Sequence, residues 1–422
     1  MATPSSDQGF DSSLGRTASI DTMTPDLRRT GPTDLSDVGE DAGLLARIRA
    51  EIGELGAMPF ARFMDLALFD PDGGYYRAAE ARPGRGGDFL TAPELHPIFG
   101  ETLAAVLEQV WDGLGRPDRF VVREHGAGEG ALADAVLGSV AGTSFGSAIR
   151  YQAVEIDPRR LAALGARLAT GGHDDRLEPA SHELIDGVVL ANEVLDALPV
   201  HRVRRRGDRL VELAVEVDGS GALVEVEIEP TTAALAGRLI AEGVTLIDGQ
   251  TAEICLAIDD WVAAAAAPLR RGIVLLIDYG APAAELYDPV RRGVGTLRAY
   301  VRHQVHDDPY RHVGRQDLTA HVDVTAVERA AVTAGLTRIG ITTQAEALMG
   351  LGIERRLRAI QADPATTIEQ YTLVRSALMR LLDPAAMGKF RVMAFGRDWP
   401  GAAPTLGLFT FRLPDRPGSH SR

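Results

Sequence analysis

One stretch, residues 121–137 (VVREHGAGEGALADAVL), constrains the fold of this chain more than any other. It begins with β-branched apolar residues, turns through Gly126, Gly128 and Gly130, and continues as an Ala- and Leu-rich segment with helical spacing. Glycine lets the backbone turn sharply without a Cβ, so a ligand can lie against the main chain. The helix that follows offers unpaired N–H groups in its first turn. The stretch therefore predicts the strand, turn and helix that open a nucleotide-binding α/β fold.

The next expected strand, residues 151–158 (YQAVEIDP), places Glu155 near its carboxyl end. A carboxylate there can accept hydrogen bonds from both hydroxyls of a ribose. Dinucleotides and S-adenosylmethionine (SAM) are both held in this way, and GAGEGA satisfies the loose dinucleotide pattern. Two observations favour SAM. The charge of Glu124, just before the glycines, would repel a pyrophosphate and suit a sulfonium or ammonium group. Glu155 also lies beyond the roughly 20 residues typical of a dinucleotide fold. A dinucleotide and a purely structural turn remain the alternatives.

Composition narrows the class of protein. The chain has 422 residues and a net charge of -15, which argues against a basic surface for nucleic acid. Its one cysteine, Cys255, excludes an intrachain disulfide and a multi-thiolate metal site. No run of 18 apolar residues predicts a membrane span, and no basic-then-apolar signal peptide is seen at the N-terminus. We therefore expect a soluble, cytoplasmic protein; the oligomeric state is not predicted.

The composition and periodicity of the chain divide it into four parts. We expect a disordered acidic tail (1–42), an N-terminal helical region (43–118), an α/β core (119–400) with an antiparallel β insertion at about 200–250, and a loose C-terminal tail (401–422). Within the second part, the glycine-rich loop 70–93 is too long for a simple connector, and such loops are often lids. Helices are expected at 231–242 and 251–269, after the alternating segment 200–230.

Polar residues follow the apolar strand at 186–191, in the order Asn192, Glu193, then Asp196. The carboxyl ends of strands in an open α/β sheet face the ligand crevice, so these side chains could bind the cofactor or a cation such as a guanidinium. The alternative is an Asx turn with a helix N-cap.

Two further groups of residues have weaker interpretations. Four arginines lie in the expected insertion, and they indicate either a solvated surface or a site for phosphate or an acidic partner: Arg202, Arg204, Arg205 and Arg206. Four histidines lie in 297–324, but their spacing is a weak signal, and no metal site is predicted: His303, His306, His312 and His321.

Five motifs occur in order along the chain: GGYY, GGDFLTAPELHPIFGETLA, VVREHGAGEGALADAVL, VLANEVLDALPVHR and DLTAHVDVTAV. Together they resemble the SAM-dependent methyltransferase family of the mitochondrial complex I assembly factor, the MidA-type protein arginine methyltransferases, and its bacterial relatives. The resemblance covers about residues 45–400. The chain departs from the family pattern at Glu129 and Ala131, where Arg and Thr are usual.

The resemblance implies a class I SAM-methyltransferase: a Rossmann-like α/β fold with a seven-stranded sheet, an N-terminal helical lid region and the antiparallel insertion. It implies SAM as cofactor and a protein arginine as acceptor, with a respiratory-complex subunit as the candidate. The expected cofactor-binding residues are Glu124, Gly126, Gly128, Gly130, Glu155 and Asn192.

Methylation of arginine also needs carboxylates, because the guanidinium is protonated at neutral pH and must be held and relieved of a proton. The candidates are Asp88 and Glu94 in the lid loop, and Glu193 and Asp196 after the strand at 186–191. Two alternatives stay open: a small-molecule methyltransferase, and a SAM-binding assembly factor without catalytic activity.

Overall fold

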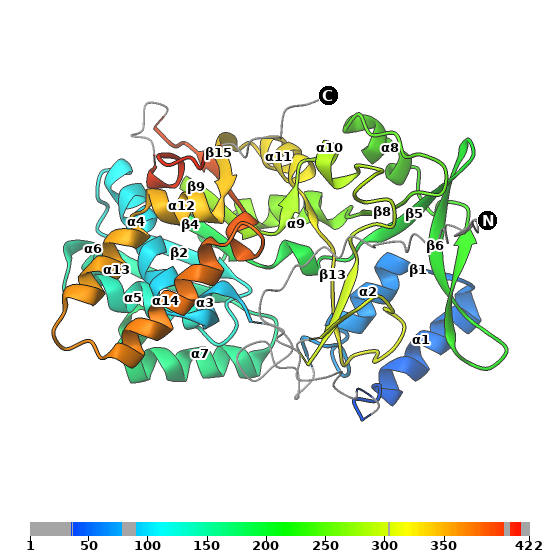
Figure 1. Cartoon of the computed structure of the whole chain (residues 1–422), viewed down its shortest axis with the longest axis horizontal. Coiled ribbons are helices and arrows are strands. Elements are labelled where there is room, and N and C mark those ends of the chain that lie inside the picture. Colours follow the sequence, from blue (N-terminus) through cyan, green and yellow to red (C-terminus); the bar gives the residue numbers. More distant parts are fainter. Residues whose placement is uncertain (1–34, 36, 78–89, 303, 401–405, 415–422) are drawn as a thin grey trace, which may run out of the picture.

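The computed structural model describes residues 35, 37–77, 90–302, 304–400 and 406–414. The expected acidic tail therefore lies mostly outside the described residues, as does Asp88. Figure 1 shows a core sheet with its helices at one end of the molecule, and a second sheet with α1 and α2 at the other.

Six strands form the core sheet in the order β15-β16-β9-β4-β2-β3. Their bounds are Thr337–Thr343, Arg391–Arg397, Leu269–Asp278, Ile185–Asn192, Phe120–His125 and Ile149–Val154, respectively. Strands β3, β2, β4 and β9 run parallel to one another. Strand β16 pairs antiparallel with β9, and β15 pairs antiparallel with β16. The expected seventh strand is reduced to one bridge, between Leu177 and Tyr151 of β3. Pro179 follows closely and has no N–H group to extend a ladder, so the seven-stranded prediction is wrong by one strand among the described residues.

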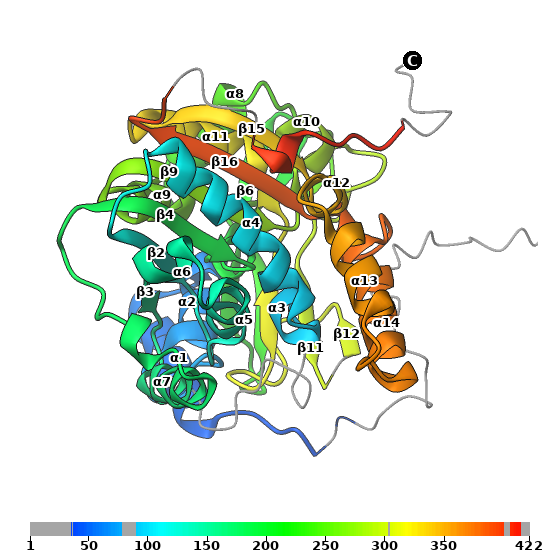
Figure 2. The same ribbon diagram turned by 90° about the vertical axis from the view of Figure 1, so that its left-hand side faces the viewer.

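Alternate residues of β4 enter two hydrophobic cores, as expected for a strand covered on both faces. Val188 and Leu190 point to one face, and Val189 and Ala191 to the other. The first face is covered by α4 (Ile98–Gly113), α5 (Ala131–Val140) and α7 (Pro158–Gly171), and the second by α9 (Ala257–Ala266) and α11 (Val324–Thr333). Figure 2 shows α4 crossing the near face of the sheet. This two-faced burial confirms the α/β class.

The expected N-terminal helical region divides between two cores. Helix α1 (Ala42–Leu55), strand β1 (Met58–Pro59) and helix α2 (Phe60–Phe69) pack with the insertion, in a cluster that includes Val215. Helices α3 (Ala92–Leu95) and α4 instead pack on the core sheet. The chain between them therefore passes from one part of the molecule to the other, and its role as a lid stays a prediction.

The insertion is an antiparallel sheet, as the alternating sequence predicts. It contains β5 (His201–Arg206), β6 (Arg209–Val217), β7 (Leu223–Ile228) and β8 (Thr251–Ile254), and β1 pairs antiparallel with Val215 and Ala214 of β6. The helix predicted from residue 251 is wrong at its start, because residues 251–254 pair with β5 and helix α9 begins only at Ala257. Helix α8 (Ala234–Ala241) packs Leu235 against Val203 of the insertion sheet.

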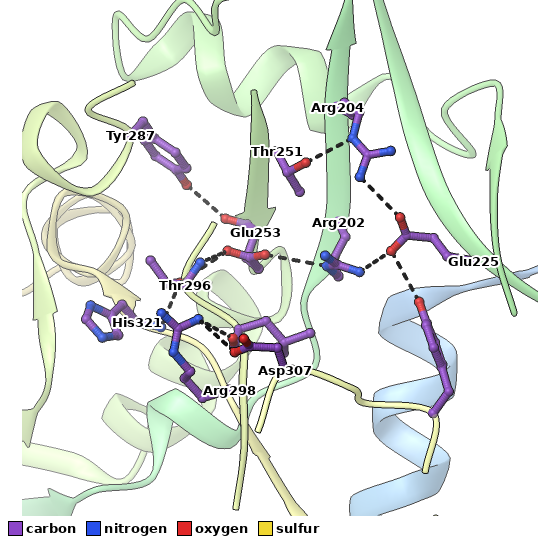
Figure 3. A network of polar contacts seen from close by, with 12 residues as sticks. Arg202, Arg204, Glu225, Thr251, Glu253, Tyr287, Thr296, Arg298, Asp307 and His321 are labelled. Atoms are coloured by element: carbon purple, nitrogen blue, oxygen red, sulfur yellow. Dashed lines mark hydrogen bonds and ion pairs between the residues drawn. The ribbon is translucent and has the colours of Figure 1, made fainter. Parts of the chain in front are cut away.

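Three of the four arginines of β5 pair with acids of the same part of the chain, whereas Arg205 donates to the Gly207 carbonyl oxygen at 2.7 Å. We call the paired set the arginine–glutamate ladder: Arg202, Arg204, Arg206, Glu225, Glu227 and Glu253. Figure 3 shows Arg202 between Glu225 and Glu253, and Arg204 beside Glu225. Arg206 reaches Glu227 at 2.5 Å. These three guanidinium groups are paired with acids of the chain itself, which argues against the phosphate or acidic-partner site that the sequence left open.

The remaining elements lie around the core sheet and between the two parts. They are α6 (Ser144–Ala148), η1 (Asp174–Arg176), η2 (Leu195–Ala197), β10 (Gly280–Ala281), α10 (Ala283–Leu286), β11 (Arg298–Val301), β12 (Gln304–His306), β13 (Asp317–Thr319), β14 (Val322–Asp323), α12 (Gln344–Gly350), α13 (Ile353–Ala362), α14 (Ile368–Leu382), η3 (Met387–Lys389) and η4 (Gly407–Phe409). The expected loose tail is wrong for residues 406–409, because Leu406 and Leu408 are buried against the first hydrophobic core. Across the described part of the chain, no helix combines the length and the apolar character that a membrane crossing requires.

Candidate active site

The glycine turn lies between β2 and α5, where the sequence predicts it. Gly126, Gly128 and Gly130 all have left-handed φ angles, of +67°, +53° and +81°. A Cβ on Gly126 would lie 2.6 Å from the Val194 side chain, and one on Gly130 would lie 2.7 Å from Leu164. A Cβ on Gly128 would meet no atom within 4 Å. Two of the glycines are therefore required by packing, while Gly128 borders open space in the cavity described below.

Glu155 follows β3 and contacts the glycine turn directly. Its Oε2 accepts the Gly128 N–H at 2.9 Å, and its Oε1 accepts the Asp157 N–H at 3.0 Å. Both bonds fix the carboxylate at the carboxyl end of the sheet. The structure thus brings together the two parts of the predicted nucleoside site, which lie on successive strands.

A cavity of about 340 Å³ opens at this edge of the sheet, within the size range of small-molecule sites. Its wall contains the glycine turn, Asn192 and residues of α2 and α3. Five carboxylic acids line it, against the single cation Arg160 among the described lining residues: Glu94, Glu124, Glu129, Glu155 and Glu193. Such a wall favours a cationic ligand over an anionic one.

Glu124 is buried at the end of β2, and its Oε2 accepts a hydrogen bond from the Tyr151 hydroxyl at 2.6 Å. Burial raises the pKa of Glu124 to about 7, in spite of this bond. From the sequence, Glu124 was expected to carry a permanent negative charge. With a pKa of about 7 it is only partly ionised at neutral pH, so its repulsion of a pyrophosphate is weaker than expected.

Glu193 stands at the end of β4 with a left-handed φ of +54°, which is uncommon for a residue other than glycine. Its Oε1 accepts the Ala92 N–H of α3 at 3.0 Å and the Asn192 side-chain amide at 2.9 Å. Burial, and then repulsion from Asp196, raise the pKa of Glu193 to about 8. Asn192 Oδ1 is buried without a hydrogen-bond partner among the described residues. An unsatisfied acceptor in a cavity wall is suited to a ligand that donates hydrogen bonds.

The other predicted catalytic acids are placed differently. Asp196 is not part of the cavity wall; its carboxyl accepts a bond from the Tyr279 hydroxyl, and burial raises its pKa to about 6. Glu94 lines the cavity and caps α3, where its Oε2 accepts from the Thr91 hydroxyl at 3.1 Å. Burial raises the pKa of Glu94 as well. Asp88 lies outside the described residues.

Aromatic residues complete the wall, and sequence reasoning gave none of them a role. Tyr76 stacks on Phe69 with ring centroids 5.6 Å apart, and the Arg160 guanidinium lies 5.7 Å from the Tyr76 ring centroid. On the other side, His125 meets Trp261 edge-to-face at 5.5 Å. Tyr76 belongs to the GGYY motif, so its signal was present in the sequence without an assigned function.

Histidines away from the cavity form no recognisable metal centre. The His306 and His312 rings lie 5.9 Å apart, edge to face. Among the described residues, which exclude His303, no cluster of three or more His, Cys, Asp or Glu side chains could hold a metal ion.

The residues of the cavity fit SAM. Gly128 leaves space where any side chain would project, and the Glu155 carboxylate beside it could accept the hydroxyls of a ribose. The unsatisfied Asn192 Oδ1 and the surrounding acids suit an ammonium group and a sulfonium.

Comparisons with known proteins agree with this fit. A family model for S-adenosyl-L-methionine-dependent methyltransferases matches residues 102–342. The mitochondrial protein arginine methyltransferase NDUFAF7 homolog of Drosophila melanogaster is 29% identical over 406 residues, covering 88% of this chain and 90% of that protein. NDUFAF7 of Danio rerio is 27% identical, covering 82% of this chain and 85% of its own.

A solved structure is also similar over nearly its whole length. It is a protein from Burkholderia thailandensis bound to S-adenosylhomocysteine, 36% identical, with a TM-score of 0.78, covering 87% of this chain and 94% of that one. The family model spans more than half of the chain, and these relatives match most of the rest. The chain therefore belongs to the S-adenosyl-L-methionine-dependent methyltransferase family that includes NDUFAF7 and its bacterial relatives, and SAM is its cofactor.

Proposed function

We propose that the protein transfers the methyl group of SAM to the guanidinium of an arginine in another protein. The observation that supports this most is the acidic wall of the cavity, where five carboxylic acids face one arginine. An arginine acceptor carries a positive charge into the site, and a wall of this kind attracts and holds it.

When bound, SAM would supply a methyl carbon on a positively charged sulfur: the acceptor nitrogen would form a bond to that carbon as the carbon–sulfur bond breaks, and S-adenosylhomocysteine would leave. The chain must therefore align the acceptor nitrogen, and alignment alone can supply several kcal/mol of the barrier. It must also take a proton from the guanidinium. Glu193 is the acid best suited to both tasks because it lines the cavity. The positive charge of a bound guanidinium favours its ionised form, and that form is a stronger base than an ordinary carboxylate because burial raises the pKa of Glu193 to about 8.

The other acids have supporting roles in this proposal. Glu155 holds the ribose, as its contact with Gly128 favours, and Asn192 accepts from the amino-acid part of the cofactor. Glu94 adds an acid to the wall of the cavity. Asp196 is turned toward Tyr279, so we assign it an indirect effect on Glu193 through its charge.

The relatives support the acceptor class by name. NDUFAF7 proteins of flies and fish are named protein arginine methyltransferases, at 29% and 27% identity to this chain. A respiratory-complex subunit is the acceptor that the family resemblance suggests, and it stays a prediction.

The test uses full-length protein, isotopically labelled SAM, and a lysate from cells that lack this protein, so that its acceptor is unmethylated. Hydrolysis and amino-acid analysis should yield labelled methylarginine in one protein band. An acceptor peptide from that band should be methylated, whereas the same peptide with lysine in place of the arginine should not. Label in a small molecule alone would replace the proposal with small-molecule methylation. SAM binding without any turnover would favour an assembly factor without catalytic activity.

A further inference from the structure

The loop at 193–196 is bound along its backbone by the last two residues of β9. The Glu193 N–H donates to the Ile277 carbonyl oxygen at 2.8 Å. The N–H groups of the next three residues all point at one oxygen, Oδ2 of Asp278, at 3.1, 2.8 and 3.4 Å. Four consecutive backbone N–H groups of the loop therefore donate to acceptors in β9, and for three of them the acceptor is the Asp278 side chain.

Asp278 is fully buried and is not part of the cavity wall. Its second oxygen, Oδ1, accepts the N–H of Tyr279 at 2.8 Å. Successive backbone N–H groups form a concavity that binds anions in many proteins. Here the concavity is filled by a carboxyl group of the chain itself, so its role concerns the shape of the loop rather than the capture of a ligand.

The loop needs such a constraint because its first residue is strained. Glu193 adopts a left-handed φ, a conformation that persists only where the surroundings impose it. This conformation directs the Glu193 carboxyl toward Ala92 and Asn192 at the cavity wall. The Asp196 carboxyl group repels that of Glu193, which tends to move the two side chains apart. The loop therefore needs hydrogen bonds that hold its backbone in place.

We propose that Asp278 is a positioning residue for methyl transfer: it fixes the loop through three backbone amides, and so fixes the Glu193 carboxyl at the cavity wall. The proposal rests on the proposed function in taking Glu193 as the acid that holds the acceptor. Asp278 itself touches neither acceptor nor cofactor.

The experiment compares Asp278→Ala, which removes all four acceptor contacts, with Asp278→Asn, which keeps one carbonyl oxygen for the loop amides. Amide hydrogen exchange is measured first, in the ligand-free protein. The informative amide is Ala92, because it donates to Glu193 and has no bond to Asp278. We expect its exchange to accelerate about tenfold or more in Asp278→Ala and less in Asp278→Asn.

Kinetics and binding give the second readout. In Asp278→Ala we expect kcat for the arginine acceptor to fall about 100-fold, as a small displacement of a reacting group can produce. Asp278→Asn should retain part of the rate. The dissociation constant for S-adenosylhomocysteine should rise much less than kcat falls, by about tenfold or less, because Gly128 and Glu155 lie outside the loop and only Glu193 and Val194 of the loop line the cavity.

Asp323→Ala is the matched control. Asp323 is also a buried acid after a strand, and its carboxylate accepts the N–H groups of Thr325 and Ala326 at 2.9 and 3.1 Å. Its loss should lower stability without changing the exchange of Ala92. If Asp278→Ala does not fold, Asp278→Ser replaces it, since a serine hydroxyl is too short to reach the loop amides.

Unchanged Ala92 exchange in a folded Asp278→Ala protein would overturn the proposal, because Glu193 would then hold its place unaided. Equal losses of kcat and of S-adenosylhomocysteine affinity would also overturn it, since Asp278 would then support the whole cofactor site. If the wild type methylates no arginine, the proposed function fails, yet the exchange measurement still decides whether Asp278 positions Glu193.

Discussion

The core sheet and the insertion each carry a dense group of charged residues, and the two groups differ in whether their charges are matched. In the arginine–glutamate ladder, each arginine has an acid within contact distance, and hydrogen bonds from Arg206 and Arg204 lower the pKa of Glu227. At the cavity, burial instead raises the pKa of Glu124 and Glu193. Matched charges stabilise the fold that holds them, whereas acids kept without a cation are suited to receive one from outside.

The largest expected difference between the cavity and the insertion is at a pair of glycines. Gly128 in the cavity and Gly207 in the insertion both have left-handed φ angles, +53° and +58°, and a Cβ on either would meet no atom within 4 Å. We expect Gly128→Val to reduce SAM affinity by about 1,000-fold or more, about 4 kcal/mol, because the side chain would occupy the cofactor space. Isothermal titration with SAM and S-adenosylhomocysteine measures this.

Gly207→Val is the control for backbone strain, since valine at a left-handed φ costs roughly 1–3 kcal/mol of stability at either position. It should lower the melting temperature to a similar extent and leave SAM affinity unchanged. Normal SAM binding by a folded Gly128→Val protein would contradict the assignment of the glycine turn to the cofactor.

The next largest effect is expected from a pair of glutamates. Glu193→Gln keeps the size of the side chain and an acceptor for the Ala92 N–H, but it cannot take a proton. We expect kcat for methyl transfer to fall by about 100-fold or more, within the range typical of a lost acid–base group. Glu227→Gln, in the ladder, should leave kcat unchanged. Initial rates of S-adenosylhomocysteine formation compare the two, and a wild-type rate for Glu193→Gln would remove this acid from the mechanism.

Sequence patterns predict the parts of the fold whose signal is local. The strand, glycine turn and helix at 121–137 and the antiparallel insertion are present as expected. Residues 251–254 were expected to be helical, and their strand depends on pairing with β5, some 50 residues earlier in the chain. The resemblance implied a sheet of seven strands without locating each of them, and beside β3 the described residues form only a single bridge at Leu177, two residues before Pro179. Tertiary pairing and single breakers of this kind are not visible in local periodicity.

For the candidate site, the sequence predicted which residues take part but not where their side chains point. Glu155 and Gly128 were predicted as neighbours and contact each other directly. Glu193 and Asp196 were predicted as equivalent acids after one strand, yet only Glu193 lines the cavity. The difference arises from the left-handed backbone at Glu193, which no residue pattern specifies for a non-glycine. Tyr76 was also missed, because its contact with Arg160 joins segments far apart in the chain.

A smaller effect, on stability alone, is expected from the ladder. Arg202 lies between Glu225 and Glu253, and its guanidinium is 5.3 Å from the Phe60 ring centroid. Arg202→Ala would leave the buried Glu253 without this cation, so we expect a loss of about 2 kcal/mol in the free energy of unfolding, between the values for exposed and buried pairs. Urea denaturation measures it.

The control for this substitution is the exposed pair of Arg209 and Glu229, where Arg209→Ala should cost about 0.5 kcal/mol or less. Neither variant should alter the affinity for S-adenosylhomocysteine. A loss of cofactor affinity in Arg202→Ala would mean that the insertion contributes to the site, and the division drawn between the two charged regions would not hold.

The last effect is a dependence of stability on pH that has opposite sign in the two regions. The pKa of Glu193 is about 8 in the folded protein, against an ordinary value of 4.5. Between these values the folded state binds more protons than the unfolded state, so this group makes stability fall as pH rises from about 5 to 8.

The pKa of Glu227 is lowered, so its contribution to stability is present above its ordinary pKa and is lost only as pH falls below that value. Glu193→Gln should therefore reduce the decline in the melting temperature of the ligand-free protein between pH 5 and 8 by roughly 5 °C, whereas Glu227→Gln should not change it. SAM should reduce the decline in the wild type as well, because a cation beside Glu193 favours the ionised acid and lowers its pKa. Superimposable pH curves for wild type and Glu193→Gln would show that this acid is already ionised at neutral pH, and the contrast between the two regions would then rest on geometry alone.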